Sequence, residues 1–143
     1  MQLSNIIRRA SGLAFALAIF ASTAVSAQSY QDMDQAWWTT LSNQLTESVA
    51  SDVDQVRQEA MQHIVFFAEN YDEFVNFDEA AYEIMGRFEA SENVEERLLA
   101  LAALSAIGED ITMERLSVVA MDLRSERVRN VAAAVILAYS TSS

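Results

Sequence analysis

Few side chains in this chain could carry chemistry, and none belongs to a recognised catalytic set. His63 is the only histidine, and it stands beside Ile64, Phe66 and Phe67. A catalytic base needs a positioned partner and a reacting group, and the sequence around His63 indicates neither. The chain has no nucleophile elbow, no phosphate-binding glycine loop and no HExxH helix. We therefore predict no catalytic residue, no cofactor and no enzymatic activity.

The densest group of acidic side chains lies around residues 72–83. Asp72, Asn76, Glu79 and Glu83 follow a 4-3-4 spacing, which places them on one ridge if residues 71–89 form a helix. A calcium site needs about six or more converging oxygens, usually from a curled loop. A straight ridge does not converge in that way, so we expect no metal. Two interpretations stay open: a solvated outer face, or a strip where Asp72, Glu79 and Glu83 dock a protein.

The overall charge excludes two classes of partner. All nine basic residues are arginine, against 21 acids, and the imbalance is confined to one part of the chain. Residues 28–96 hold 16 acids and two arginines, whereas residues 97–143 hold five of each. Nucleic acids and anionic membranes both need a basic face, so we expect neither as a partner. An alternative reading of the acidity is adaptation to a salt-rich habitat.

The first 27 residues have the pattern of an export signal. Arg8 and Arg9 precede an uncharged apolar run over residues 12–25, and Ala27 ends a small-residue cleavage pattern. We expect cleavage before Gln28 and a periplasmic or secreted protein of 28–143. An uncleaved membrane anchor is the alternative, although the run is short for a membrane span. The chain has no cysteine, so neither a disulfide nor a zinc thiolate site is possible.

The elements that must position these residues are predicted to be helices. The chain has no proline, and only Gly86 and Gly108 are glycines after residue 27, so helix breakers are scarce. Apolar stripes at helical spacing predict helices over residues 32–47, 52–67, 71–89, 92–107, 111–123 and 125–139. Ser91 is the expected cap of the fourth helix and Gly108 its expected stop. The fourth helix is apolar nearly all round, so it must be covered on several sides.

Three arginine blocks recur at a regular spacing in this pattern. Each arginine is followed by alanine at +3, apolar residues at +7 and +10, and a small residue at +11. The blocks are Arg57-Ala60-Ile64-Phe67-Ala68, Arg97-Ala100-Leu104-Ile107-Gly108 and Arg129-Ala132-Ile136-Tyr139-Ser140. Periods of 40 and 32 residues between the arginines are typical of helical-hairpin repeats. We predict an all-α fold, a short α-solenoid of three hairpins over residues 32–68, 71–107 and 111–140.

These blocks, together with the run from Ala103 to Gly108, resemble the HEAT-repeat family over residues 32–140. The resemblance implies a protein that presents a binding surface, and together with the export signal it makes the chain an expected exported bacterial member of the family. It also implies that the repeat arginines pair with acids near the turns. The candidate acids are Asp54, Glu92 or Glu95, and Asp122 or Glu126. The turn prolines of the family are absent here.

Two apolar features are further candidate docking sites. Trp37 and Trp38 are adjacent, so one helix cannot bury both on the same face; Trp38 fits the core stripe. Trp37 is then either a surface anchor for a partner or a lid on the core. Residues 131–139 contain no charged side chain, although a terminal repeat ordinarily turns a polar face outward. A homodimer through this helix would use Val131, Val135, Ile136 and Tyr139; the alternative is that neighbouring helices cover them.

The function that these expectations favour is an exported, non-catalytic protein-interaction or scaffold module of the bacterial envelope. One alternative is a ligand-binding protein or an accessory subunit of an envelope enzyme, which would require a cleft near His63, Tyr71 and Tyr82. Another is a salt-adapted acidic protein of structural role. After cleavage we expect no stable insertion in a membrane.

Overall fold

The computed structural model describes residues 29–142, and every regular element in that range is a helix. The predicted all-α class is confirmed for this part of the chain, and the predicted signal at 1–27 lies outside it. The described range contains six α-helices: α2 (Gln35–Val49), α3 (Asp54–Asn70), α4 (Asp78–Ala90), α5 (Val94–Ile107), α6 (Asp110–Val119) and α7 (Glu126–Ser142). Two short 3-10 helices, η1 (Tyr30–Asp32) and η2 (Ala120–Asp122), precede α2 and follow α6.

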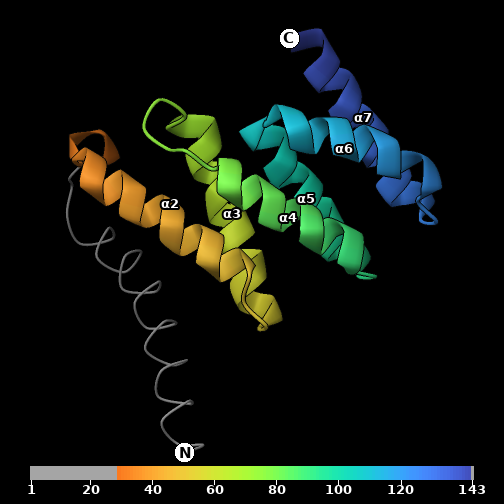
Figure 1. Ribbon diagram of the computed structural model, residues 1–143, viewed down its shortest axis with the longest axis horizontal. Coiled ribbons are helices and arrows are strands. Elements are labelled where there is room, and N and C mark those ends of the chain that lie inside the picture. The colour runs from red at the N-terminus through yellow and green to blue at the C-terminus, as the bar shows by residue number, and fades with distance from the viewer. Residues whose placement is uncertain (1–28, 143) are drawn as a thin grey trace, which may run out of the picture.

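The helices pack in chain order from α2 at one end to α7 at the other (Figure 1). Helix α2 contacts α3 and α4, and α4 contacts α5 and α6. Helix α5 contacts α3, α4 and α7, and α7 also packs on α6. Helices α2, α4 and α6 therefore follow one another along one side, and α3, α5 and α7 along the other.

Helix α5 lies at the centre of the core, as its apolar sequence requires. Ala100, Leu101, Ala103 and Leu104 are fully buried beneath the three helices that contact α5. Gly108 ends the helix with φ 65°, in the left-handed region that glycine adopts without strain. Both the multiple cover and the glycine stop agree with the sequence prediction.

Each of the three block arginines donates a hydrogen bond to a backbone carbonyl that precedes its own helix in the sequence. Arg57 and Arg129 donate to carbonyls in the loops before their own helices, at Ser51 and Leu123, over distances of 2.9 and 3.0 Å. Arg97 donates over 3.1 Å to the carbonyl of Phe88, in the last turn of α4. The alanines three residues later, Ala60, Ala100 and Ala132, are all buried. In each block the arginine thus ties its helix to the backbone of the segment that precedes that helix.

The expected pairing of these arginines with acids holds only for the first. Arg57 lies 2.6 Å from Asp54. Within residues 29–142, neither Arg97 nor Arg129 forms an ion pair. Arg97 lies instead over the ring of Phe88, 5.5 Å from its centroid.

The predicted start of the third helix at Tyr71 is wrong. Residues 71–77 form a turn, and α4 begins only at Asp78. The Asn76 side chain accepts a hydrogen bond of 3.0 Å from the Asp78 backbone N–H, a local contact that competes with helix formation. Tyr71 is held back among aromatic rings, with its centroid 5.5 Å from that of Trp38.

Two other helix ends also differ from the prediction. Asn93, and not Ser91, caps α5, because its side chain accepts from the backbone N–H groups of Glu95 and Glu96. Helix α7 continues through the serine-rich tail to Ser142, where the hydroxyls bond back to carbonyls of the preceding turn. Ser125 does open α7 as expected, since its hydroxyl accepts from the Val128 N–H.

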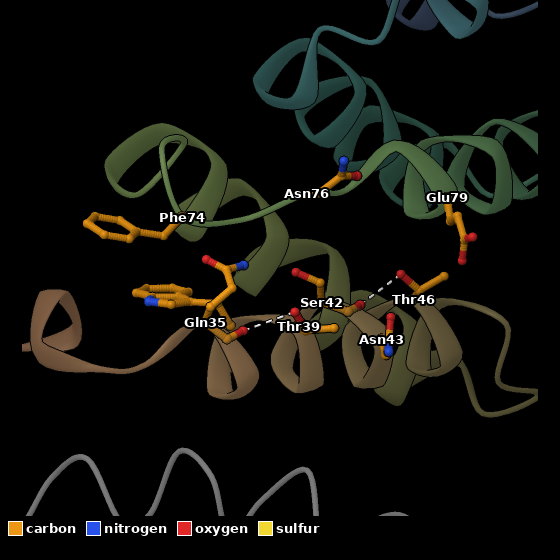
Figure 2. A pocket seen from close by; sticks show the side chains of 9 residues that line it. Gln35, Thr39, Ser42, Asn43, Thr46, Phe74, Asn76 and Glu79 are labelled. Atoms are coloured by element: carbon orange, nitrogen blue, oxygen red, sulfur yellow. Dashed lines mark hydrogen bonds between the residues drawn. The ribbon is translucent and has the colours of Figure 1, made fainter.

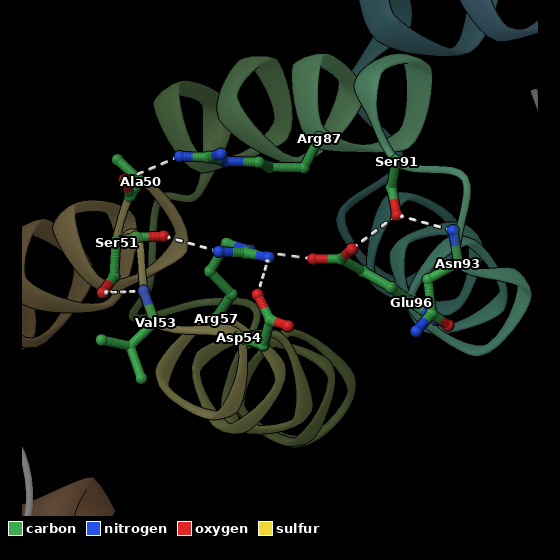
Figure 3. Close-up of polar contacts among 9 residues, drawn as sticks. All are labelled: Ala50, Ser51, Val53, Asp54, Arg57, Arg87, Ser91, Asn93 and Glu96. Carbon is green, nitrogen blue, oxygen red and sulfur yellow. Dashed lines mark hydrogen bonds and ion pairs between the residues drawn. The ribbon is translucent and has the colours of Figure 1, made fainter.

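One buried ion pair joins Arg57 of the first arginine block to Glu96, the residue directly before the second block (Figure 3). The Arg57 Nε donates to Glu96 Oε1 at 2.8 Å, from α3 to α5, and the two side chains are only 10% and 8% exposed. Ser91 donates to the other Glu96 oxygen at 2.5 Å. Both Glu96 oxygens and three nitrogens of Arg57 therefore have partners.

The network also shifts the ionisation of both partners. The hydrogen bond to Glu96 raises the pKa of Arg57 further above its ordinary value, against the opposing effect of burial. Burial would raise the pKa of Glu96, but the hydrogen bonds from Ser91 and Arg57 and the charge of Arg57 outweigh it, so the net pKa is lowered. Glu96 is thus held ionised inside the fold.

Replacing Arg57 by alanine should lower the free energy of unfolding by about 3 kcal/mol, because Glu96 would stay buried without its partner. Arg127→Ala is the matched control. Arg127 and Glu95 also lie 2.8 Å apart but are 65% and 73% exposed, so the loss should stay below about 1 kcal/mol. Urea unfolding measures both, and equal losses would contradict the role assigned to burial.

Replacing Arg57 by leucine together with Glu96 by valine should recover most of that loss. Glu96 stands directly before the block arginine Arg97, and the other two blocks have valine at that position, Val56 and Val128. A well-packed apolar pair can replace a buried ion pair at little cost in stability. The same urea series tests this. A double variant no more stable than Arg57→Ala would show that the site requires the charges.

Acidification should remove the contribution of Glu96 to stability. Because its folded pKa is lowered, the contribution is fully present above the ordinary value of 4.5 and is lost as the pH falls through the lower folded value. The difference in unfolding free energy between wild type and Glu96→Gln isolates this effect from the repulsion among the other acids. It should be constant at neutral pH and shrink below the ordinary value; a difference that grows there would contradict the shift.

Candidate functional site

The outer side of α6, η2 and α7 carries the most exposed large apolar side chains of the described chain. Val118, Met121 and Leu137 are 61, 78 and 67% exposed. Met121 and Leu137 border a hollow of about 440 Å³ between α6, η2 and α7. Its lining residues are Ser117, Ala120, Met121, Arg129, Ala133, Ile136, Leu137 and Ser140. We call this surface the C-terminal face.

The helices shape this face because α7 turns its larger side chains inward. Val128 and Ala132 are buried, and Val131 and Val135 are half-buried against the core. The alanines Ala133, Ala134 and Ala138 point outward and leave a low surface beside Leu137. Small residues allow another backbone to approach closely, and the exposed leucine and methionine supply apolar contact area.

The four residues predicted to form a dimer contact lie against the core. Val131, Val135, Ile136 and Tyr139 are all half-buried and packed against the core, and only Ile136 borders the hollow. The Tyr139 hydroxyl donates to Asp110 at the start of α6. Neighbouring helices therefore cover much of the predicted surface, as the alternative to a dimer contact supposes.

The sequence reasoning missed Val118, Met121 and Leu137. Leu137 lies in the same apolar run as Ile136 but one position further round the helix, which turns it away from α5. Val118 and Met121 are three residues apart, the spacing of neighbours on one helical face.

The proposed acidic strip is not a continuous ridge. Asp72 lies in the turn before α4, whereas Glu79 and Glu83 lie on α4 itself, and all three are exposed. Glu79 borders a second hollow, between α2 and α4 (Figure 2). Within residues 29–142, no three histidine or acidic side chains are grouped so as to hold a metal ion.

Trp37 lies at the edge of an aromatic cluster at the α2 end. Its ring centroid is 4.9 Å from that of Trp38, nearly perpendicular, and 5.9 Å from that of Tyr30. Trp38 is buried and Trp37 half-buried, as the helical stripe predicted. These ring contacts pack Trp37 against Tyr30 of η1 and Trp38 of α2.

His63 and Tyr82 border neither hollow. His63 is half-buried on α3, and burial lowers its pKa while the charge of Glu59 opposes the shift. The Tyr82 hydroxyl donates to Glu109 at 3.5 Å. Its pKa is raised by desolvation first, and then by the charge of Glu109 and this hydrogen bond. The cleft that the ligand-binding alternative required near these residues is therefore not one of the two hollows.

Among the helices that the structure describes, none is both long enough and apolar enough to cross a membrane. No family model matches the chain, and no curated protein or solved structure matches it either.

Proposed function

We propose that this protein is a non-catalytic interaction module that acts in the bacterial envelope and pairs with a second copy of itself through the C-terminal face. Its helices are interpreted as a short α-solenoid of HEAT-like hairpins, α2–α3, α4–α5 and α6–α7. The recurring arginine contact and the packing of α2, α4 and α6 along one side support this interpretation. Export rests on the apolar segment before residue 28.

The exposure of Leu137 and Met121 beside an apolar hollow is the observation that carries the docking proposal. A helix face that no further repeat covers is ordinarily polar in a repeat array, which keeps the array soluble. Here α7 instead presents alanines and a leucine, and η2 presents a methionine. Covering these side chains removes apolar area from water, which stabilises an associated state.

The distribution of charge favours a second copy as the occupant of this face. Residues 28–96 carry 16 acids and two arginines, so two copies repel one another at that end. Residues 97–143 carry five acids and five arginines, and α6 and α7 belong to this neutral part. Contact between the two neutral ends keeps the acidic halves apart. A twofold arrangement would place Leu137 of each copy against the hollow of the other.

Replacing Leu137 and Met121 by glutamate together should convert the associated protein to a monomer, because four like charges would enter one twofold contact. Both positions are exposed, so the helical content should not change. Ile111→Glu is the matched control: Ile111 is 59% exposed on α6 but does not border the hollow. Sedimentation velocity measures the outcome, with circular dichroism as the check of folding.

An association that survives in the Leu137 and Met121 double variant would show that another surface is used. An association lost equally in Ile111→Glu would show a general effect of added charge. A wild-type chain that is monomeric at every concentration would contradict pairing itself.

A further inference from the structure

A second hollow, of about 270 Å³, lies between α2 and the segment that leads into α4. Figure 2 shows the side chains of Gln35, Ser42 and Thr46 rising from α2 toward the segment of Phe74 and Asn76. Glu79 reaches toward the same space from α4 (Figure 2). The remaining lining residues are Trp38, Thr39 and Asn43. This hollow is at the opposite end of the chain from the C-terminal face.

Two buried polar atoms of its lining have no hydrogen-bond partner among the described residues. They are the Trp38 Nε1 and the Ser42 Oγ, in side chains that are 1% and 7% exposed. A buried donor without a partner is destabilising, and native proteins leave few such groups. Trp38 and Ser42 are four residues apart on one face of α2, and both line the hollow. The destabilisation by their unpaired polar atoms is therefore concentrated beside this hollow.

The rest of the lining offers further donors and acceptors. The side chains of Gln35, Asn43 and Glu79 make no hydrogen bond to another described residue. The hydroxyls of Thr39 and Thr46 donate to carbonyls of α2, which leaves their oxygens able to accept. Amide, hydroxyl and indole groups therefore present both kinds of hydrogen-bonding atom to the same small volume.

The charge of the lining limits what can enter. Glu79 is the single charged residue of the hollow, and no arginine borders it. The surrounding half of the chain is strongly acidic, so phosphates and carboxylates are repelled. The half-buried ring of Phe74 adds an apolar wall, stacked on Trp38 with a centroid distance of 5.2 Å and an angle of 17°.

We propose that this hollow binds a neutral, hydroxyl-rich small molecule, a monosaccharide or the end of a glycan. Such a molecule carries many donors and acceptors on few atoms and has C–H edges that suit an aromatic wall. Its oxygens would accept from Trp38 Nε1 and Ser42, and its hydroxyls would donate to Glu79. Trp38 Nε1 and Ser42 Oγ are closed to water, so a sugar reaches these two atoms only when a side chain of the lining moves.

The indole N–H resonances of the two tryptophans provide a direct test. The full-length chain, as the expressing cell processes it, is labelled with ¹⁵N and titrated separately with glucose, galactose and N-acetylglucosamine at millimolar concentrations. At least one sugar should shift the Trp38 resonance in a saturable way while the Trp37 resonance stays in place. Trp37→Phe assigns the two resonances. Absence of a Trp38 shift with all three sugars overturns the proposal.

Two variants and one control then locate the site. Ser42→Ala and Glu79→Gln should each weaken binding about tenfold, since each removes a hydrogen-bonding group from the hollow. Thr40→Ala, on the exposed side of α2, should leave the affinity unchanged. Equal affinity in all three variants would place the sugar elsewhere and overturn the proposal.

The unliganded stability of Ser42→Ala gives a readout that does not depend on the choice of sugar. Because the Ser42 hydroxyl has no described partner, its removal should leave the unfolding midpoint unchanged or raise it. A lower midpoint would show that this hydroxyl is already bonded within the protein, which would overturn the proposal.

Discussion

Helix α5 needs cover on three sides, and the other helices are arranged by that requirement. Leu101 and Leu104 are fully buried, and α3, α4 and α7 supply the surfaces that bury them. An apolar helix of this kind cannot be stable at the edge of a protein. Helix α7 therefore turns its inner side toward α5, and within residues 29–142 no other helix covers its outer side. The exposed C-terminal face is a consequence of this arrangement.

Arginine supplies most of the polar contacts that hold alternate helices of the chain together. Arg57 pairs with Glu96 between α3 and α5, and Arg115 pairs with Glu89 between α6 and α4. Arg127 on α7 reaches Glu95 on α5, and Arg87 on α4 donates to the carbonyl of Ala50 after α2 at 2.7 Å. A guanidinium makes several hydrogen bonds in a fixed fork. This geometry lets Arg57 bind an adjacent helix and the preceding turn at once, which suits a chain without lysine.

Much of the helical arrangement follows from local sequence signals. The block alanines, the stripe around Trp38 and the stop at Gly108 are each specified by spacing or by backbone conformation. The turn before α4 was not predictable in this way, because the Asn76 contact and the packing of Tyr71 override a continuous helical pattern. The outward set of Leu137 and Met121 depends on how α7 rotates against α5, which is a property of tertiary packing. The partner of Arg57, 39 residues away, depends on it too.

The most direct test of pairing through the C-terminal face is the mass of the processed wild-type chain in solution, measured by light scattering after size exclusion at low and high salt. Apolar contact between two neutral ends predicts a dimer that persists at high salt, since screening weakens the repulsion between the acidic halves and leaves the contact intact. A monomer at both salt concentrations, or a dimer that dissociates as salt is raised, would contradict the account.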